Sequence, residues 1–138
     1  MKRYVLDSFS VIAFFEDDEG SDFVADILRE IVDGRAEGYM SVINWGEVLY
    51  NIMREQGADA AARVLRKFDT YPIRLIPADR DRTREAATLK AQFRIAYADC
   101  FVAALAREMN APVVTGDPEF GLIEKICAVA WAGQEGRS

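Results

Sequence analysis

Short apolar runs alternate along the chain with longer segments in which apolar residues recur every three or four positions. A short apolar run between turn signals is typical of a buried strand, whereas recurrence at three and four marks one face of a helix. The apolar runs predict strands at residues 2–7, 38–43, 71–77, between the turns of 110–117, and at 127–132. The helical periodicity predicts helices at residues 8–20, 21–34, 44–57, 58–68, 78–94 and 97–109.

The alternation of strands and helices predicts an α/β fold. We expect a mainly parallel central sheet flanked by helices, an α/β/α sandwich with right-handed crossovers. A chain of 138 residues fits one domain with a single core. We place this domain at residues 1–132 and expect the polar remainder, 133–138, to be a short flexible tail.

Several boundaries carry residues that commonly cap helices. Ser8 or Ser10 is a candidate N-cap for the first helix, Ser21 or Asp22 for the second, and Asp79 for the helix at 78–94.

The composition narrows the chemistry that is available. The chain has no histidine, which excludes histidine bases, Ser-His-Asp triads and nearly all catalytic zinc sites. Any catalysis must therefore rest mainly on carboxylates. Cys100 and Cys127 stand in apolar surroundings and are expected to be buried thiols, which is typical of a reducing compartment. No signal peptide and no apolar stretch of about 20 residues is present, so we expect a cytoplasmic protein that does not enter a membrane.

Charge is unevenly distributed along the chain. The net charge is −6, yet residues 54–94 hold ten Lys and Arg against six Asp and Glu, while the remainder holds seven against seventeen. An acidic region beside a basic flank is one interpretation, and ordinary mixed helix surfaces are the other. The acidic stretch 16–19 stands before Gly20 and is expected to be a solvated loop.

One acid stands inside the most apolar segment of the chain. From Ile95 to Ala106 nearly every residue is apolar or aromatic, and the single charged residue is Asp99. On a helix Asp99 would share a face with apolar neighbours. An ionised carboxylate is costly to desolvate there unless something pairs with it.

Three further acids stand near the predicted strand ends. Asp7 ends the first strand, Thr115 and Asp117 follow a later strand, and Glu47 lies in the first turns of the helix after the second strand. Ligands of open parallel sheets gather at the carboxyl ends of the strands. Four acids that met there with Asp99 would repel one another unless they shared a hard divalent cation such as Mg²⁺ or Mn²⁺. Each acid alone also fits an ordinary cap, turn or first-turn helix position.

The order and spacing of these residues resemble a known family. The stretches YVLDSFSVIAFFE, INWGEVLYNI and LKAQFRIAYADCFVAALAREMNAPVVTGDPEF are similar to PIN domains, and particularly to the toxin ribonucleases of VapC-type toxin–antitoxin pairs. The family pattern is matched by Asp7 with Ser8, by Glu47, by Asp99, and by Thr115, Asp117 and Phe120.

The resemblance implies a single PIN-like domain with metal-dependent endoribonuclease activity. By that resemblance Asp7, Glu47, Asp99 and Asp117 would hold Mg²⁺ or Mn²⁺, while Thr115 and Ser8 would hydrogen-bond a carboxylate, a water or a phosphate oxygen. The implied partners are an RNA substrate, single-stranded or looped, and a cognate antitoxin protein. Basic residues of 80–94 are candidates for phosphate contacts. The apolar residues Trp45, Tyr50 and Met53 fit core packing, a homodimer face or an antitoxin groove.

Three other functional classes remain open. A receiver-like domain that accepts a phosphoryl group also gathers acids and Mg²⁺ at strand ends, but it needs an acidic pair after the first strand, where this chain has Asp7 and Ser8. A haloacid-dehalogenase-like phosphatase needs a second Asp at position 9, which is Phe9 here. An inactive PIN-like module that only binds RNA or protein would not need all four acids.

Overall fold

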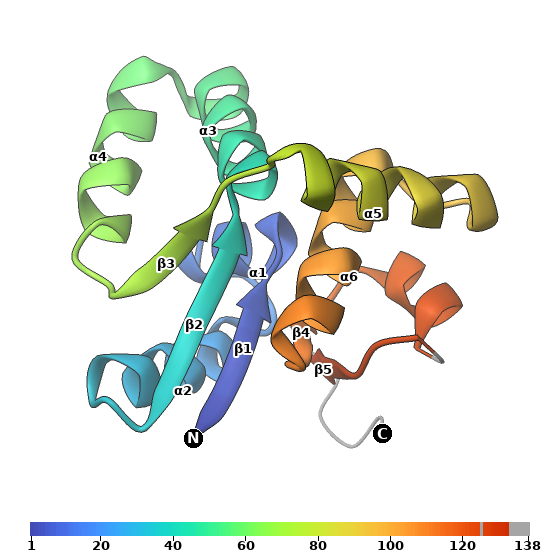
Figure 1. The fold of residues 1–138 in the computed structure, drawn as a ribbon. Helices are drawn as coiled ribbons and strands as arrows, with labels where there is room; N and C mark the ends of the chain where they lie inside the picture. Colours follow the sequence, from blue (N-terminus) through green and yellow to red (C-terminus); the bar gives the residue numbers. More distant parts are fainter. Residues whose placement is uncertain (125, 133–138) are drawn as a thin grey trace.

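The computed structural model describes residues 1–124 and 126–132 as one α/β/α sandwich around an all-parallel sheet (Figure 1). The predicted tail, 133–138, lies outside the described residues. The sheet order is β3-β2-β1-β4-β5, which confirms the expected fold class. The strands are β1 (Lys2–Leu6), β2 (Ala36–Ser41), β3 (Ile73–Ile76), β4 (Val113–Thr115) and β5 (Val129–Trp131).

Six α-helices and one 3₁₀ helix surround this sheet in the described part of the chain. They are α1 (Ser8–Phe15), α2 (Ser21–Val32), α3 (Val42–Gln56), α4 (Ala58–Phe68), α5 (Arg80–Gln92), α6 (Tyr97–Met109) and η1 (Pro118–Ile123). In Figure 1, α3 and α4 run side by side at one end of the molecule, and α5 and α6 lie together beside the sheet.

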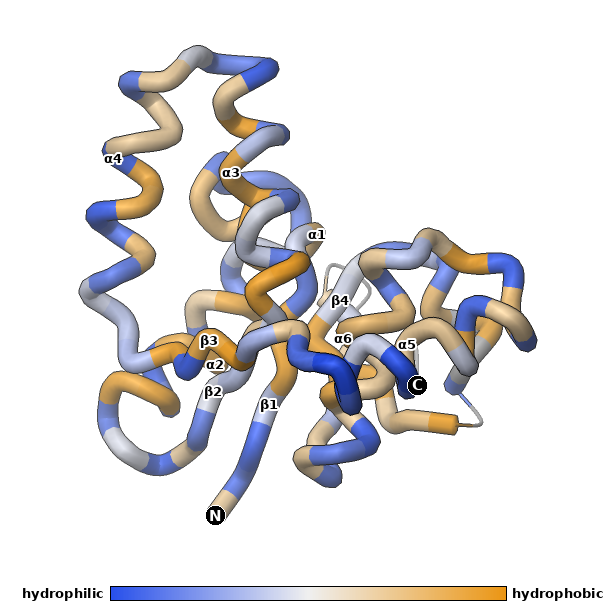
Figure 2. The backbone as a smooth tube through the Cα atoms, turned by 45° about the horizontal axis from the view of Figure 1, so that its top comes forward, coloured by the Kyte–Doolittle hydropathy of each residue, from blue (hydrophilic) through white to orange (hydrophobic). Residues whose placement is uncertain are grey.

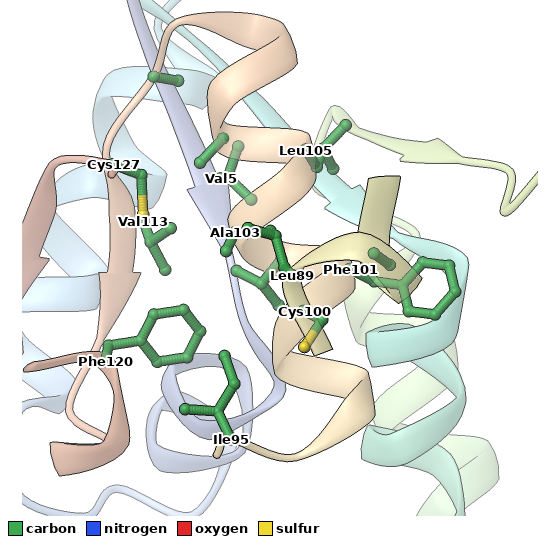
Figure 3. Close-up of a cluster of buried hydrophobic side chains, with 14 of the residues drawn as sticks. Val5, Leu89, Ile95, Cys100, Phe101, Ala103, Leu105, Val113, Phe120 and Cys127 are labelled. Atoms are coloured by element: carbon green, nitrogen blue, oxygen red, sulfur yellow. The ribbon is translucent and has the colours of Figure 1, made fainter. Parts of the chain in front are cut away.

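The structure has a hydrophobic core on each face of the sheet, and successive residues of the central strands contribute to the two cores in turn. Val5 and Val113 pack with α5 and α6, whereas their neighbours Leu6 and Val114 pack with α1, α2, α3 and α4. The first core also holds Phe120 from η1 and both buried cysteines (Figure 3). Because strand side chains alternate between faces, each short apolar run covers both layers.

Strand β1 becomes apolar toward the edge of the sheet where it ends. Figure 2 shows β1 changing from hydrophilic at its start to hydrophobic at its end, and Val5 and Leu6 are fully buried. None of the helices in the described part of the chain combines the length and the apolar composition that crossing a bilayer requires.

The structure corrects several predicted boundaries. The helix predicted at 8–20 ends at Phe15, and its N-cap is Asp7 rather than Ser8 or Ser10. The second helix is preceded by Gly20 and has no side-chain cap, so neither Ser21 nor Asp22 takes that position.

The strand predicted at 38–43 lies too far along the chain. β2 ends at Ser41, whose hydroxyl accepts a hydrogen bond from the Ile43 amide and starts α3 at Val42. The β-branched pair Val42 and Ile43 favoured a strand, but the Ser41 cap prevailed. Asp79 is the N-cap of α5, as predicted.

We expect Gly38→Ala to lower the free energy of unfolding by about 1–3 kcal/mol, because the buried strand cannot move away from α2. A Cβ at Gly38 would lie 2.6 Å from Ile31 Cδ1. Ile31→Val removes that carbon, so the double variant should lose less than the two single variants together. Urea denaturation of the four proteins measures this cycle, and additive losses would contradict the contact.

Candidate metal centre

The site lies where the sheet changes its direction of growth. From β1 the chain adds β2 and β3 on one side, and it then returns to add β4 and β5 on the other. A crevice at the carboxyl ends of β1 and β4 follows from this order. A pocket of about 340 Å³ occupies this region, lined by Ser8, Phe9, Ile12, Glu16, Glu47, Asn51, Glu55, Ala96, Asp99, Asp117 and Glu119.

Asp7 lies at the inner end of this site, directly after β1. It is 1% exposed. Its Oδ1 accepts the Ser10 amide at 2.8 Å and its Oδ2 accepts the Thr115 hydroxyl. Burial raises the pKa of Asp7 to about 7, and the charge of Asp117 adds to the shift, although the hydrogen bonds oppose it.

Thr115 links two of the acids. Its hydroxyl donates to Asp7 and accepts the Asp117 amide at 2.9 Å. The last residue of β4 therefore fixes the Asp7 carboxylate and the backbone of Asp117 at once.

Asp99 lies in the first turn of α6 and is 7% exposed. Asp99, Asp117 and Glu119 each place one carboxylate oxygen so that the three atoms lie within 4.8 Å of one another. The pKa of Asp99 is raised to about 8. Burial is the largest cause, and the hydrogen bond with Glu119 and the charges of Asp117 and Asp7 raise it further.

Glu47 belongs to the wall of the same pocket. Its Oε1 accepts the Ser8 hydroxyl at 2.9 Å and the Asn44 amide at 3.1 Å. Ser8 thus contacts a carboxylate, and it does so without capping α1. The four acids expected from the sequence lie at one edge of the sheet, and two of them, Asp7 and Glu47, are outside the set of three close oxygens.

Three acids of the pocket, Glu16, Glu55 and Glu119, were not among the candidates from the sequence. Glu119 belongs to the Asp99 group because Asp117 caps η1 and Pro118 starts it, which turns Glu119 back toward the site. The Asp-Pro pair was a usable signal for such a turn. Glu16, which the sequence placed in a solvated loop, lines the pocket at the end of α1.

Cationic side chains of the described residues do not balance these acids. None of the ion pairs found among residues 1–124 and 126–132 includes Asp7, Glu47, Asp99, Asp117 or Glu119. The donors that reach the carboxylates are neutral amides and hydroxyls. An all-oxygen donor set of this charge fits a hard divalent cation such as Mg²⁺ or Mn²⁺.

Comparison with known proteins agrees with this fold. The PIN domain family model matches residues 4–126. No curated protein matches the chain significantly.

Solved structures with a similar fold include toxin–antitoxin complexes. A DNA-bound VapBC from Salmonella typhimurium is 15% identical with a TM-score of 0.74, and VapBC2 from Rickettsia felis bound to promoter DNA is 18% identical with a TM-score of 0.73. Each alignment covers 94% of this chain and 98% of the other. VapC20 from Mycobacterium tuberculosis, a sarcin-ricin loop cleaving toxin, is 14% identical with a TM-score of 0.69, over 86% of this chain and 92% of that one. At these identities the likeness shows the fold.

We expect the metal-free protein to lose stability as the pH rises from about 4 to about 8. Asp7 and Asp99 have folded-state pKa values of about 7 and about 8, above their ordinary value of 3.8. The folded state therefore binds more protons in this window, and deprotonation destabilises it. Melting temperatures measured in a chelator across this range test the slope.

Asp99→Asn should flatten that slope, because the amide does not titrate. Asp59→Asn, at an acid in the first turn of α4, is the matched control and should keep the parent slope. A parent slope in Asp99→Asn would contradict the assignment.

Proposed function

Since the chain belongs to the PIN domain family, we propose that it is a metal-dependent endoribonuclease that cleaves RNA phosphodiester bonds. The observation that carries this proposal is the group of carboxylates around the buried Asp99, which lie together without a basic partner among the described residues. Such a group fits an ion-binding centre better than a structural core, because the ionised acids destabilise the fold in the absence of a cation.

Five acids would hold the ion or ions. Asp7, Glu47, Asp99 and Asp117 are the ligands implied by the family pattern, and Glu119 joins them because its carboxylate lies beside Asp99. A bound divalent ion lowers the pKa of a coordinated water and stabilises charge on the scissile phosphate.

The neutral residues of the site orient the acids. Thr115 holds one oxygen of Asp7, and Ser8 holds one oxygen of Glu47. Asp117 is fixed at both ends, because its amide binds Thr115 and its Oδ1 accepts the Glu119 amide at 3.0 Å. The carboxylates are therefore preorganised before any ligand arrives.

The pocket also offers a surface for a nucleotide. Phe9 lines it and is 45% exposed, so its ring is available to stack on a base of unpaired RNA. Among the basic residues of 80–94, Arg82 is already paired with Asp79 and Glu108. Arg94, exposed two residues before the pocket residue Ala96, is the better candidate for a phosphate contact.

We further propose that the protein is the toxin of a type II toxin–antitoxin pair and acts in the cytoplasm. The similar solved structures from Salmonella and Rickettsia are toxin–antitoxin complexes. Tyr50 and Met53, both nearly half exposed on α3, give an apolar surface for a cognate antitoxin or a homodimer partner. The PIN assignment disfavours the receiver-like alternative, and a cleavage assay separates the active enzyme from an inactive PIN-like module.

We expect Asp99→Asn to lower Mg²⁺- or Mn²⁺-dependent RNA cleavage by about 100-fold or more, while the protein stays folded. The change keeps the size of the side chain and removes its charge from the centre of the site. Cleavage of a fluorescent single-stranded RNA measures the rate, and circular dichroism checks the fold. Asp59→Asn controls for the loss of an acid elsewhere, and cleavage by Asp99→Asn at the parent rate would refute the site.

Binding of Mn²⁺ or Mg²⁺ should raise the melting temperature of the parent protein. The cation binds the folded site and offsets the repulsion among its acids. The rise should shrink in Asp99→Asn and persist in Asp59→Asn. A melting temperature that does not change across the titration would count against a metal centre here.

A further inference from the structure

Asn44 stands out among the polar residues around the site because it is fully buried. It lies in the first turn of α3 and is 0% exposed. Its Nδ2 donates to Glu47 Oε1 at 3.1 Å and to the Ala98 carbonyl at 3.2 Å. Only the amide nitrogen can donate to two acceptors, so these contacts fix the orientation of the side chain.

The two acceptors belong to the two walls of the site. Glu47 lies one turn further along α3, and Ala98 is the residue before Asp99 in the first turn of α6. One amide group therefore sets the Glu47 carboxylate and the start of the Asp99 helix relative to each other. A shift of either element would break one of the two hydrogen bonds.

The remaining oxygen of Asn44 has no evident structural purpose. Asn44 Oδ1 is buried, and no hydrogen-bond donor in residues 1–124 or 126–132 reaches it. A buried unpaired acceptor costs about 1–3 kcal/mol. An apolar side chain of similar size would avoid that cost, so the asparagine is a poor choice for packing alone.

The hydrogen bonds at Glu47 are also one-sided. Ser8 and Asn44 both donate to Oε1, and among the described residues no donor forms a hydrogen bond with Oε2. The pair holds the carboxylate by one oxygen and leaves the other available to a ligand of the pocket.

We propose that Asn44 is a positioning residue of the nuclease site, which fixes the Glu47 carboxylate against the helix that carries Asp99. This inference rests on the proposed metal-dependent nuclease function. Asn44 acts through Glu47 and touches neither RNA nor the ion.

The main test is a double-variant cycle of Asn44→Leu and Glu47→Gln. Asn44→Leu should raise the Mn²⁺ concentration for half-maximal RNA cleavage by about 10- to 100-fold, as the loss of an orienting partner does at metal sites. In the Glu47→Gln background the same change should add no more than about two-fold, because the carboxylate it orients is gone.

Thermal melting supplies a readout that does not depend on activity. Metal-free Asn44→Leu loses two hydrogen bonds together with the unpaired Oδ1, so its melting temperature should stay near that of the parent. It should nevertheless need more Mn²⁺ for the same rise in melting temperature. Asn44→Ala repeats both titrations if the leucine does not fit.

Asn51→Leu is the matched comparison on the same helix. Asn51 Nδ2 donates at 2.8 Å to the backbone carbonyl of Glu47 and not to its carboxylate. We expect Asn51→Leu to shift the Mn²⁺ concentration for half-maximal cleavage less than Asn44→Leu does. Equal shifts from the two variants, or multiplicative losses in the double variant, would overturn the positioning role.

A lower metal-free melting temperature of Asn44→Leu with an unchanged Mn²⁺ midpoint would assign Asn44 to folding alone and overturn the inference. In that case the parent protein would still cleave RNA with Mn²⁺, so the proposed function would stand. A parent protein without metal-dependent cleavage would instead refute the proposed function, and the inference with it.

Discussion

Several carboxylates lie together at one edge of the sheet, and no basic side chain of the described residues pairs with them. Burial and mutual repulsion raise the pKa values of Asp7 and Asp99 to about 7 and about 8. The neighbouring donors, such as the Thr115 and Ser8 hydroxyls, orient carboxylate oxygens without cancelling their charge. A hard divalent cation would match the oxygen donors of this site and offset their charge.

The fold offsets part of this repulsion through its helix starts. Asp7 caps α1, Asp117 caps η1, and Asp99 lies in the first turn of α6. Helix N-termini carry partial positive charge and free amide groups, and the Ser10 amide lowers the pKa of Asp7 against the effect of burial. In a parallel sheet the connecting helices begin near the carboxyl ends of the strands, so the topology that forms the crevice also brings these helix starts to it.

At Glu47 and Asp117 the polar network holds one oxygen of the carboxylate and leaves the other free of hydrogen bonds from the described residues. Glu47 is held through Oε1 alone, and Asp117 Oδ1 accepts the amide of Glu119. Holding one oxygen fixes the rotamer of a carboxylate while the other stays available for coordination. Asn44 also holds the backbone, because the side-chain amide that donates to Glu47 donates to the Ala98 carbonyl at the start of α6 as well.

The sequence by itself determined the α/β architecture, since strand and helix periodicities are local properties, and helices 58–68 and 97–109 have the predicted bounds. The sequence also identified Asp99 as a candidate site residue, because a single acid in an apolar helix can be recognised without a structure. It could not show Glu119 beside Asp99 or Asn44 between Glu47 and Ala98, since these contacts join residues that only the packed sheet brings together. The start of α3 was missed for a local reason: the β-branched residues Val42 and Ile43 favour a strand, but the Ser41 hydroxyl accepts the Ile43 amide and begins the helix at Val42.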